Sequence, residues 1–175
     1  KDKFVTIYNA FDTATIAKKA EEPVNSLLIS RPYILAVQRL EESQKDLSTL
    51  IRAYKILVDK YAIKENLYVI GEGKSRTDLQ NLCQRLNITD RVVFLKKQIN
   101  PYPWMKHCRT FVLSSKFEGF GIVLIEAMAL NCPIVSSNCP TGPEEILAFG
   151  KAGALVPIGD KQAMATPIER TLSDT

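Results

Sequence analysis

Residues 33–61 read YILAVQRLEESQKDLSTLIRAYKILVDKY and contain one complete strand–helix unit. The apolar run 33–37 has the length and composition of a buried strand. From Leu47 to Tyr61, apolar residues recur at steps of three and four, which predicts an amphipathic helix with Asp46 as its N-cap. A strand that is apolar on both faces needs cover on both faces, so this unit indicates a parallel sheet between two layers of helices.

The same alternation of strands and helices continues along the chain. Further strands are predicted at residues 67–70, 91–95, 110–113, 133–136 and 154–156, and further helices at residues 79–86, 102–108, 121–130, 144–149 and 160–172. Residues 9–32 are predicted to be an irregular connector. The pattern predicts one α/β domain over residues 1–175, with a doubly wound, Rossmann-like parallel sheet that binds ligands beyond the carboxyl ends of its strands.

Composition argues against several classes of protein. The chain has 46% hydrophobic and 24% charged residues, as soluble globular proteins do, and no apolar run approaches the ~18 residues that cross a bilayer. The net charge of +4 is spread along the chain, without the blocks of like charge that mark nucleic-acid-binding tails. The four cysteines form no C-x2-C pair and His107 is the one histidine, so no metal site is expected; Cys83 and Cys132 are predicted to be reduced core thiols.

Glu126 is the one charged residue in the apolar segment 121–130, GIVLIEAMAL. A helix that is hydrophobic on every side is expected to be buried, and a buried carboxylate is costly unless it is paired or bound to a ligand. One interpretation is a salt bridge to a neighbour, or a side chain that reaches the surface. The interpretation that we favour is that Glu126 contacts a polar ligand, such as ribose hydroxyls.

The segment 114–121, SSKFEGFG, leads into this helix and ends with Gly119, Phe120 and Gly121. Glycines let backbone N–H groups approach a ligand closely, and a helix N-terminus favours negative charge, which suits a phosphate or a sugar hydroxyl. A tight turn with N-capping serines explains the pattern equally well. Glu118 precedes Glu126 by eight residues. On a helix that spacing is a little over two turns, so we expect both carboxylates to face one cleft and to contact different parts of an extended ligand.

Two cations lie between the first strand and its helix. Arg39 follows the strand 33–37, and Lys45 stands just before the helix begins. At the carboxyl edge of a parallel sheet both would point into the ligand crevice, where the Arg fork and the Lys point charge could neutralise a diphosphate. A basic surface loop is the alternative interpretation.

Two turn-rich segments follow other strands. Residues 138–146 contain Thr141 and Gly142 before Pro143 and offer further hydrogen-bond donors at the start of a short helix. Residues 71–74, GEGK, lack the full Gly-x-Gly-x-x-Gly pattern. Each segment taken alone is a turn.

Taken together, these segments resemble the C-terminal, donor-binding domain of the family 4 retaining glycosyltransferases, also called group 1, which have the GT-B fold. The matching pieces follow the family's order and cover nearly the whole chain: residues 7–12, Arg39-Leu40 with Lys45, residues 69–73, the Glu-x7-Glu signature within 111–129, and residues 133–135, 141–146 and 153–157. Each piece is weak alone, but seven in order are specific.

The resemblance implies a nucleotide-sugar donor, with a UDP-sugar expected. It assigns the diphosphate to Arg39 and Lys45, the ribose to Glu126, the transferred sugar to Glu118 and the backbone of Gly119, Phe120 and Gly121, the uracil to the region from Lys97 to Pro101 with Arg76, and further donor contacts to Thr141 and Gly142. It names Glu118, Arg39 and Lys45 as the catalytic residues. No metal or other cofactor is expected, because the two cations would stabilise the departing nucleoside diphosphate.

The resemblance also implies that the acceptor, a glycan or a lipid-linked glycan, is bound by an N-terminal domain outside this chain. Residues 1–32 would then be a strand and an irregular connector that lead in from that domain. We expect the isolated chain to bind a nucleotide weakly and not to transfer sugar. No nucleic-acid partner is expected. The expected location is the cytoplasm, and peripheral association of the full-length protein with the cytoplasmic membrane face is compatible with it.

Two other classes of protein share this type of fold. A non-catalytic nucleotide-binding module, such as a flavodoxin-like receiver, would need an acidic cluster at its first strand ends, whereas the strand 33–37 is followed by Gln38 and Arg39. A nucleotide-sugar epimerase fits the fold, but the Glu-x7-Glu spacing argues against it. The sequence therefore predicts a retaining glycosyltransferase that uses a UDP-hexose or UDP-N-acetylhexosamine to build a polysaccharide or glycolipid.

Overall fold

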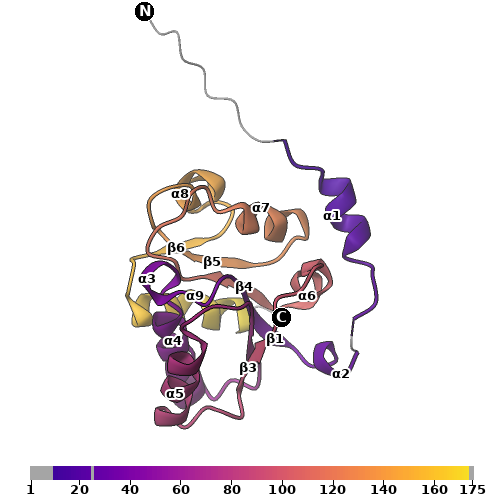
Figure 1. The fold of residues 1–175 in the computed structure, drawn as a ribbon. Coiled ribbons are helices and arrows are strands. Elements are labelled where there is room, and N and C mark those ends of the chain that lie inside the picture. The colour runs from indigo at the N-terminus through magenta and orange to yellow at the C-terminus, as the bar shows by residue number, and fades with distance from the viewer. Residues whose placement is uncertain (1–9, 25, 174–175) are drawn as a thin grey trace, which may run out of the picture.

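The computed structural model of the chain describes residues 10–24 and 26–173 (Figure 1). Its centre is a six-stranded parallel sheet with strand order β3-β2-β1-β4-β5-β6. The strands are β1 Tyr33–Val37, β2 Asn66–Ile70, β3 Val92–Leu95, β4 Thr110–Leu113, β5 Ile134–Ser137 and β6 Ala154–Val156. Each of the six strands predicted within the described residues is present, with ends that differ from the prediction by at most one residue, which confirms the doubly wound α/β sheet.

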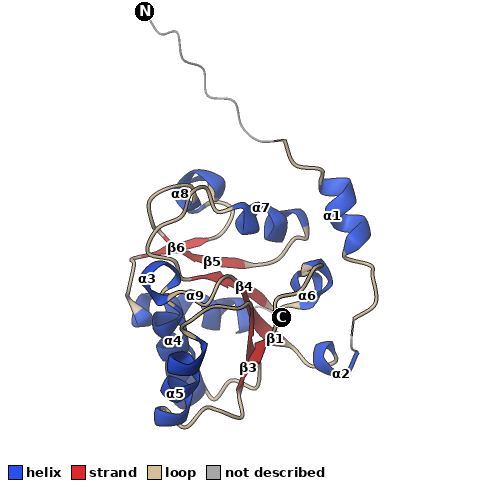
Figure 2. Ribbon diagram, in the orientation of Figure 1, coloured by secondary structure: helices blue, strands red, loops and turns tan. Residues whose placement is uncertain are grey.

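Helices cover both faces of this sheet (Figure 2). They are α1 Thr13–Lys19, α2 Ser26–Ile29, α3 Glu42–Lys45, α4 Leu47–Tyr61, α5 Arg76–Arg85, α6 Tyr102–His107, α7 Ile122–Ala129, α8 Pro143–Ile146, η1 Ala148–Gly150 and α9 Lys161–Ser173. Helices α4, α5 and α9 form one hydrophobic core with the sheet, and α6 and α7 form a second core on the opposite face. Among the described helices, none is long and apolar enough to cross a membrane.

The alternation of side chains along β1 produces the two cores. Ile34 and Ala36 pack toward α4 and α9, whereas Tyr33 and Leu35 pack toward α6 and α7, and all four are fully buried. The Tyr33 hydroxyl donates a hydrogen bond to the backbone carbonyl of Trp104 (2.7 Å), which attaches α6 to the centre of the sheet. Strand β1 therefore has no polar face, as the continuous apolar run indicates.

The predicted irregular connector over residues 9–32 is wrong in its central part, because α1 and α2 lie within it. The Asp12 carboxylate accepts a hydrogen bond from the backbone N–H of Thr15 (2.9 Å) and caps α1, and Ile16 is buried on one side of the helix. Helix α1 packs against α6 and α7, so this segment is helical because a neighbouring layer covers Ile16, its one buried residue. The predicted first strand at residues 7–9 lies outside the described residues.

Helix α7 is not buried on every side, contrary to the prediction from its apolar sequence. Leu124 and Ala127 face the core, but the side chains of Ile122 and Met128 are 47% and 36% exposed. The reason is its place in the outer layer, where one side of the helix faces the sheet and part of the other remains uncovered within the described chain. Glu126 therefore lies on a helix that is only partly enclosed.

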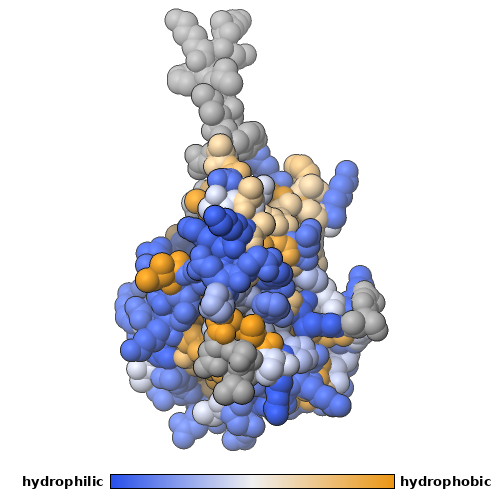
Figure 3. Space-filling model, turned by 90° about the vertical axis from the view of Figure 1, so that its right-hand side faces the viewer, coloured by the Kyte–Doolittle hydropathy of each residue, from blue (hydrophilic) through white to orange (hydrophobic). Residues whose placement is uncertain are grey.

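The face of the molecule that carries α1 and α6 is mainly hydrophilic, and hydrophobic side chains form separate patches on it (Figure 3). Among the large apolar residues of the described chain, Ile99, in the loop that follows β3, has a high exposed fraction.

Candidate active site

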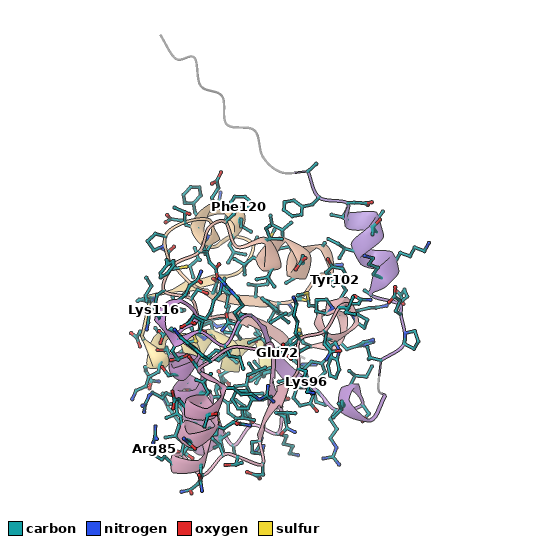
Figure 4. The ribbon with its side chains drawn as sticks, viewed as in Figure 1. Glu72, Arg85, Lys96, Tyr102, Lys116 and Phe120 are labelled. Carbon is teal, nitrogen blue, oxygen red and sulfur yellow. The ribbon has the colours of Figure 1, made fainter. Side chains whose placement is uncertain are left out.

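The candidate site lies where the strand order of the sheet reverses, between β1 and β4. Both strands end at the same edge because they are parallel, so the loops that follow them meet. The backbone N–H of Lys116 donates to the carbonyl of Gln44 (2.7 Å), and the Ser114 hydroxyl donates to the carbonyl of Lys45 (2.7 Å). Figure 4 shows Lys116 beside α3. The two loops form one connected edge, as the topology requires.

Lys45 and Glu118 meet at this edge and form a salt bridge. Their Nζ and Oε1 atoms are 2.6 Å apart, and the side chains are 11% and 9% exposed. The Ser115 hydroxyl donates to the same Oε1 atom (2.5 Å). The prediction brought both residues to the donor, but it did not anticipate that they neutralise each other, because nothing in the sequence relates two side chains that come from different strands.

Lys45 lies in the turn that joins α3 to α4, and this turn is held by hydrogen bonds. One turn of helix, α3, ends at Lys45, whose N–H donates to the carbonyl of Glu41 (2.7 Å). Asp46 then takes a left-handed conformation (φ 46°), which starts α4 in a new direction. Its carboxylate accepts from the Thr49 hydroxyl (2.9 Å) and makes no hydrogen bond to the helix backbone, so the N-cap position was predicted correctly but not its capping bond.

Gln38 and Ser114 complete the attachment of Lys45 and were not predicted as site residues. The Gln38 amide donates to the Ser114 hydroxyl (3.1 Å) and to the Lys45 carbonyl (3.4 Å), and Gln38 is only 8% exposed. A buried glutamine directly after an apolar strand is the signal in the sequence that could have indicated this role. The network holds the ends of β1 and β4 against the turn that carries Lys45.

Arg39 is exposed and points its guanidinium at a neutral partner. Its Nη2 donates to Oε1 of Gln44 (2.9 Å), and within the described residues it forms no salt bridge. Arg39 also borders a cavity of about 440 Å³ at the carboxyl ends of β1 and β2. The cavity is lined by Val37, Gln38, Arg39, Ile70, Gly71, Glu72, Lys97, Gln98 and Pro101. The predicted base region, residues 97–101, contributes three of these residues.

Gly71 and Gly73 allow the loops around this cavity to touch. A Cβ atom on Gly71 would lie 2.0 Å from the carbonyl oxygen of Gln38, and one on Gly73 would lie 2.3 Å from the carbonyl oxygen of Leu40. Any larger residue would force β1 and β2 apart at their ends. The short Gly-Glu-Gly segment is therefore a packing requirement of the cavity wall.

Arg76 does not line this cavity. Its Nη2 donates to the backbone carbonyl of Phe94 (2.8 Å), and its guanidinium lies 5.7 Å from the centre of the Phe94 ring. The structure therefore uses Arg76 to attach the start of α5 to β3.

Glu118 and Glu126 are not related by helical spacing, contrary to the prediction. Helix α7 begins at Ile122, so Glu118 lies in the preceding loop and faces Lys45. Glu126 lies on α7, and its Oε1 accepts a hydrogen bond from the Tyr102 hydroxyl on α6 (3.0 Å). Burial raises the pKa of the Glu126 carboxyl above its ordinary value. Figure 4 shows Tyr102 on the side of α6 next to α7.

The loop before α8 supports the loop before α7. The Thr141 hydroxyl donates to the carbonyls of Gly119 (3.0 Å) and Glu118 (3.2 Å), and the N–H of Glu118 donates to the carbonyl of Pro140 (2.8 Å). A Cβ atom on Gly142 would lie 1.8 Å from the carbonyl oxygen of Phe120. In the structure, Thr141 and Gly142 thus hold residues 118–120 in place through the backbone.

The start of α7 presents backbone donors. Gly121 has a left-handed conformation (φ 89°), which is the reason for a glycine at this N-cap. Across the described chain, the N–H groups of Gly119, Phe120 and Gly121 donate no hydrogen bond to another protein group. This segment can therefore bind an acceptor atom of a ligand.

In the part of the chain that the structure describes, no group of three or more His, Cys, Asp and Glu side chains is arranged to hold a metal ion. The four cysteines are free and buried, including Cys83 and Cys132, as predicted for core thiols.

Comparison with known proteins identifies the family. Residues 18–175 match the family described as glycosyl transferases group 1. The chain belongs to this family. The six-stranded sheet and the solved structures that it resembles confirm that the chain is the C-terminal half of a GT-B architecture.

Individual relatives align with 82–96% of the chain. An N-acetylgalactosamine-N,N'-diacetylbacillosaminyl-diphospho-undecaprenol 4-alpha-N-acetylgalactosaminyltransferase from Campylobacter jejuni is 34% identical over 168 residues, which are 96% of this chain and 44% of that protein. The lipopolysaccharide outer core galactosyltransferase WaaB is 28% identical (TM-score 0.72; 82% of this chain, 41% of that one). HepE of Anabaena, solved in complex with UDP-glucose, is 25% identical (TM-score 0.79; 96% and 47%). The chain thus spans less than half the length of these relatives.

Proposed function

We propose that this chain holds the UDP-sugar donor of a glycosyltransferase that transfers a hexosyl or N-acetylhexosaminyl group with retention of configuration. The observation that carries the proposal is the cation pair at the carboxyl end of β1. Arg39 and Lys45 lie at the topological switch point, next to a buried carboxylate and a cavity large enough for a nucleobase. A cation pair beside a cavity suits a nucleoside diphosphate better than it suits a neutral ligand.

In this proposal the diphosphate lies between Arg39 and Lys45. Arg39 has a neutral partner, so its charge is available to a phosphate. Lys45 is paired with Glu118, and a diphosphate would compete with that carboxylate for the ammonium. The two cations would then stabilise the negative charge that develops on the departing UDP, a role that requires no metal ion.

The nucleoside would occupy the cavity of about 440 Å³ lined by residues 97–98 and Pro101. The ribose hydroxyls would reach Glu126, whose second oxygen has no partner among the described residues. The transferred sugar would lie by Glu118 and the N–H groups at the start of α7. Uridine is the proposed base because HepE, a member of the same fold, is solved with UDP-glucose.

The acceptor would be a polysaccharide or lipid-linked glycan bound by a domain outside this chain. Two of the relatives are named for such acceptors: a diphospho-undecaprenol-linked glycan and lipopolysaccharide. The exposed apolar side of α7, with Ile122 and Met128, fits a surface that the second domain covers. We therefore propose that the isolated chain does not transfer sugar, and that the full-length protein acts in the cytoplasm or at the cytoplasmic membrane face.

Calorimetric titration with UDP, GDP, ADP and their sugars tests this proposal. We expect UDP compounds to bind more tightly than the others, and Arg39→Ala to weaken UDP about tenfold, because a charge-assisted hydrogen bond to phosphate is lost. Arg85→Ala is a matched control, since Arg85 is an exposed cation at the far end of α5 (Figure 4). Equal affinity of the Arg39→Ala and Arg85→Ala variants for UDP would contradict the proposal. So would the absence of nucleotide binding at millimolar concentration in both this chain and the full-length protein.

A further inference from the structure

Ser115 is the second donor to the carboxylate of Glu118. The Oε1 atom of Glu118 accepts from Lys45 Nζ (2.6 Å) and from Ser115 Oγ (2.5 Å), while its Oε2 atom has no hydrogen-bond partner among the residues that the structure describes. One oxygen of the carboxylate is therefore held by the protein, and the other accepts no hydrogen bond from the described residues.

Ser115 is itself held rigidly. It is fully buried at the end of β4, and its backbone carbonyl accepts a hydrogen bond from the Ser137 hydroxyl (2.5 Å) at the end of β5. The sheet therefore fixes the backbone of Ser115, and its short, buried side chain has only one rotatable bond with which to reach Glu118. Lys45 differs, because its ammonium is carried on a flexible four-carbon stem.

The backbone of Glu118 is fixed by hydrogen bonds with Pro140 and Thr141, but these bonds do not orient its side chain. Only Lys45 and Ser115 do so among the described residues. A diphosphate that attracts the Lys45 ammonium would remove the first of these two contacts. The second would remain, since Ser115 is neutral and buried and has no reason to follow the phosphate.

We infer that Ser115 is a positioning residue that keeps Glu118 directed at the transferred sugar while Lys45 is engaged by the diphosphate. The inference rests on the proposed function. It gives the two donors of Glu118 different tasks: Lys45 responds to the nucleotide part of the donor, and Ser115 maintains the sugar part of the site.

The test is the sugar-dependent gain in affinity, which is the ratio of the dissociation constant of UDP to that of a UDP-sugar. It is measured by calorimetry on this chain with UDP-glucose, UDP-galactose, UDP-N-acetylglucosamine and UDP-N-acetylgalactosamine. We expect Ser115→Ala to reduce this ratio about tenfold for the preferred sugar and to change UDP affinity less than about twofold. Ser136→Ala is the matched control, because Ser136 is equally buried, donates to the carbonyl of Ser137 and does not contact Glu118.

A double-mutant cycle separates positioning from general destabilisation. If Ser115 acts through Glu118, then Ser115→Ala should cause no further loss in a Glu118→Gln background. Should Ser115→Ala fail to fold, Ser115→Cys keeps a similar shape with a much weaker donor, and the same loss is expected.

The inference would be overturned if Ser115→Ala left the ratio unchanged, including the case in which it weakened UDP and the UDP-sugar equally. Additive losses in the double variant would also overturn it. Either result would leave the proposed function standing. If the unmodified chain binds UDP and shows no gain from any of the sugars, the placement of Glu118 at the sugar is wrong and the inference falls with it.

Discussion

Lys45→Met removes the positive partner of Glu118 while it keeps most of the side-chain volume. Both side chains are about nine-tenths buried, so the carboxylate that remains cannot turn to water. Breaking a buried ion pair typically costs about 3–5 kcal/mol. The Ser115 hydroxyl still donates to Glu118, so we expect a smaller decrease in the free energy of unfolding, about 2–3 kcal/mol. For a domain of this size that corresponds to a melting temperature lower by about 4–12 °C.

Urea unfolding followed by circular dichroism measures this loss, and a second substitution checks its cause. Adding Glu118→Gln to Lys45→Met removes the unpaired charge and should return stability to within about 1 kcal/mol of the original chain. Lys55→Met is the control, because its pair with Asp59 is exposed (30% and 56%) and should contribute less than about 1 kcal/mol. The reasoning is refuted if Lys45→Met costs no more than the control, or if the double variant is as unstable as Lys45→Met alone.

Three further outcomes follow from the described geometry. Gly142→Ala should destabilise the chain by about 3 kcal/mol or more in thermal unfolding, because its Cβ would meet a carbonyl oxygen at 1.8 Å. Gly150→Ala is the control: Gly150 also has a positive φ but has open space around it, so this change should cost about 1 kcal/mol. Burial raises the pKa of Glu126, so the folded state binds a proton at this carboxyl more tightly than the unfolded state does. The free energy of unfolding should therefore fall as pH rises from the ordinary pKa of 4.5 through the folded pKa. Glu126→Gln should abolish that fall in urea titrations across pH 4–7. Ile122→Ser should change the free energy of unfolding of this chain by less than about 1 kcal/mol, whereas Leu124→Ala should lower it by about 2–5 kcal/mol. If chemical unfolding showed similar losses for the two variants, the outer side of α7 would be covered in this chain.

Strand positions could be predicted from the sequence because each strand is a short apolar run between turn residues. Helix α4 was predicted for a similar reason, since its apolar period is unbroken over four turns. The short helices α1, α2 and α3 were missed. In α1 and α3 a tertiary contact determines the structure: α3 is held at Lys45 by Gln38 and Ser114, and α1 is held by its packing on α7.

The residues of the candidate site could be named from the sequence, but their mutual contacts could not. The motif order indicated Lys45, Glu118 and Glu126, and the helical spacing then misassigned Glu118 to the same face of a helix as Glu126. The error arose because helical spacing does not apply across residues 118–121: α7 begins at Ile122, and Glu118 lies outside even the predicted helix 121–130. Sequence spacing carries no information about the distance between loops that follow different strands, and the Lys45–Glu118 contact is of that kind.

The Lys45–Glu118 pair also bears on why a donor would need both a diphosphate and a sugar. For Lys45, the Glu118 carboxylate is an oxygen anion like the phosphate that would replace it. For Glu118, the Lys45 ammonium is a hydrogen-bond donor like the sugar hydroxyl that would replace it. In the proposed complex a UDP-sugar would supply phosphate oxygens to Lys45 and hydroxyls to Glu118, so each buried charge would keep a charged or hydrogen-bonding partner during the exchange. UDP alone would satisfy Lys45 but leave Glu118 with the Ser115 hydroxyl as its one donor among the described residues. The sugar should therefore add affinity beyond its own contacts, and Glu118→Gln, which removes the charge, should bring the affinities for UDP and UDP-sugar closer together.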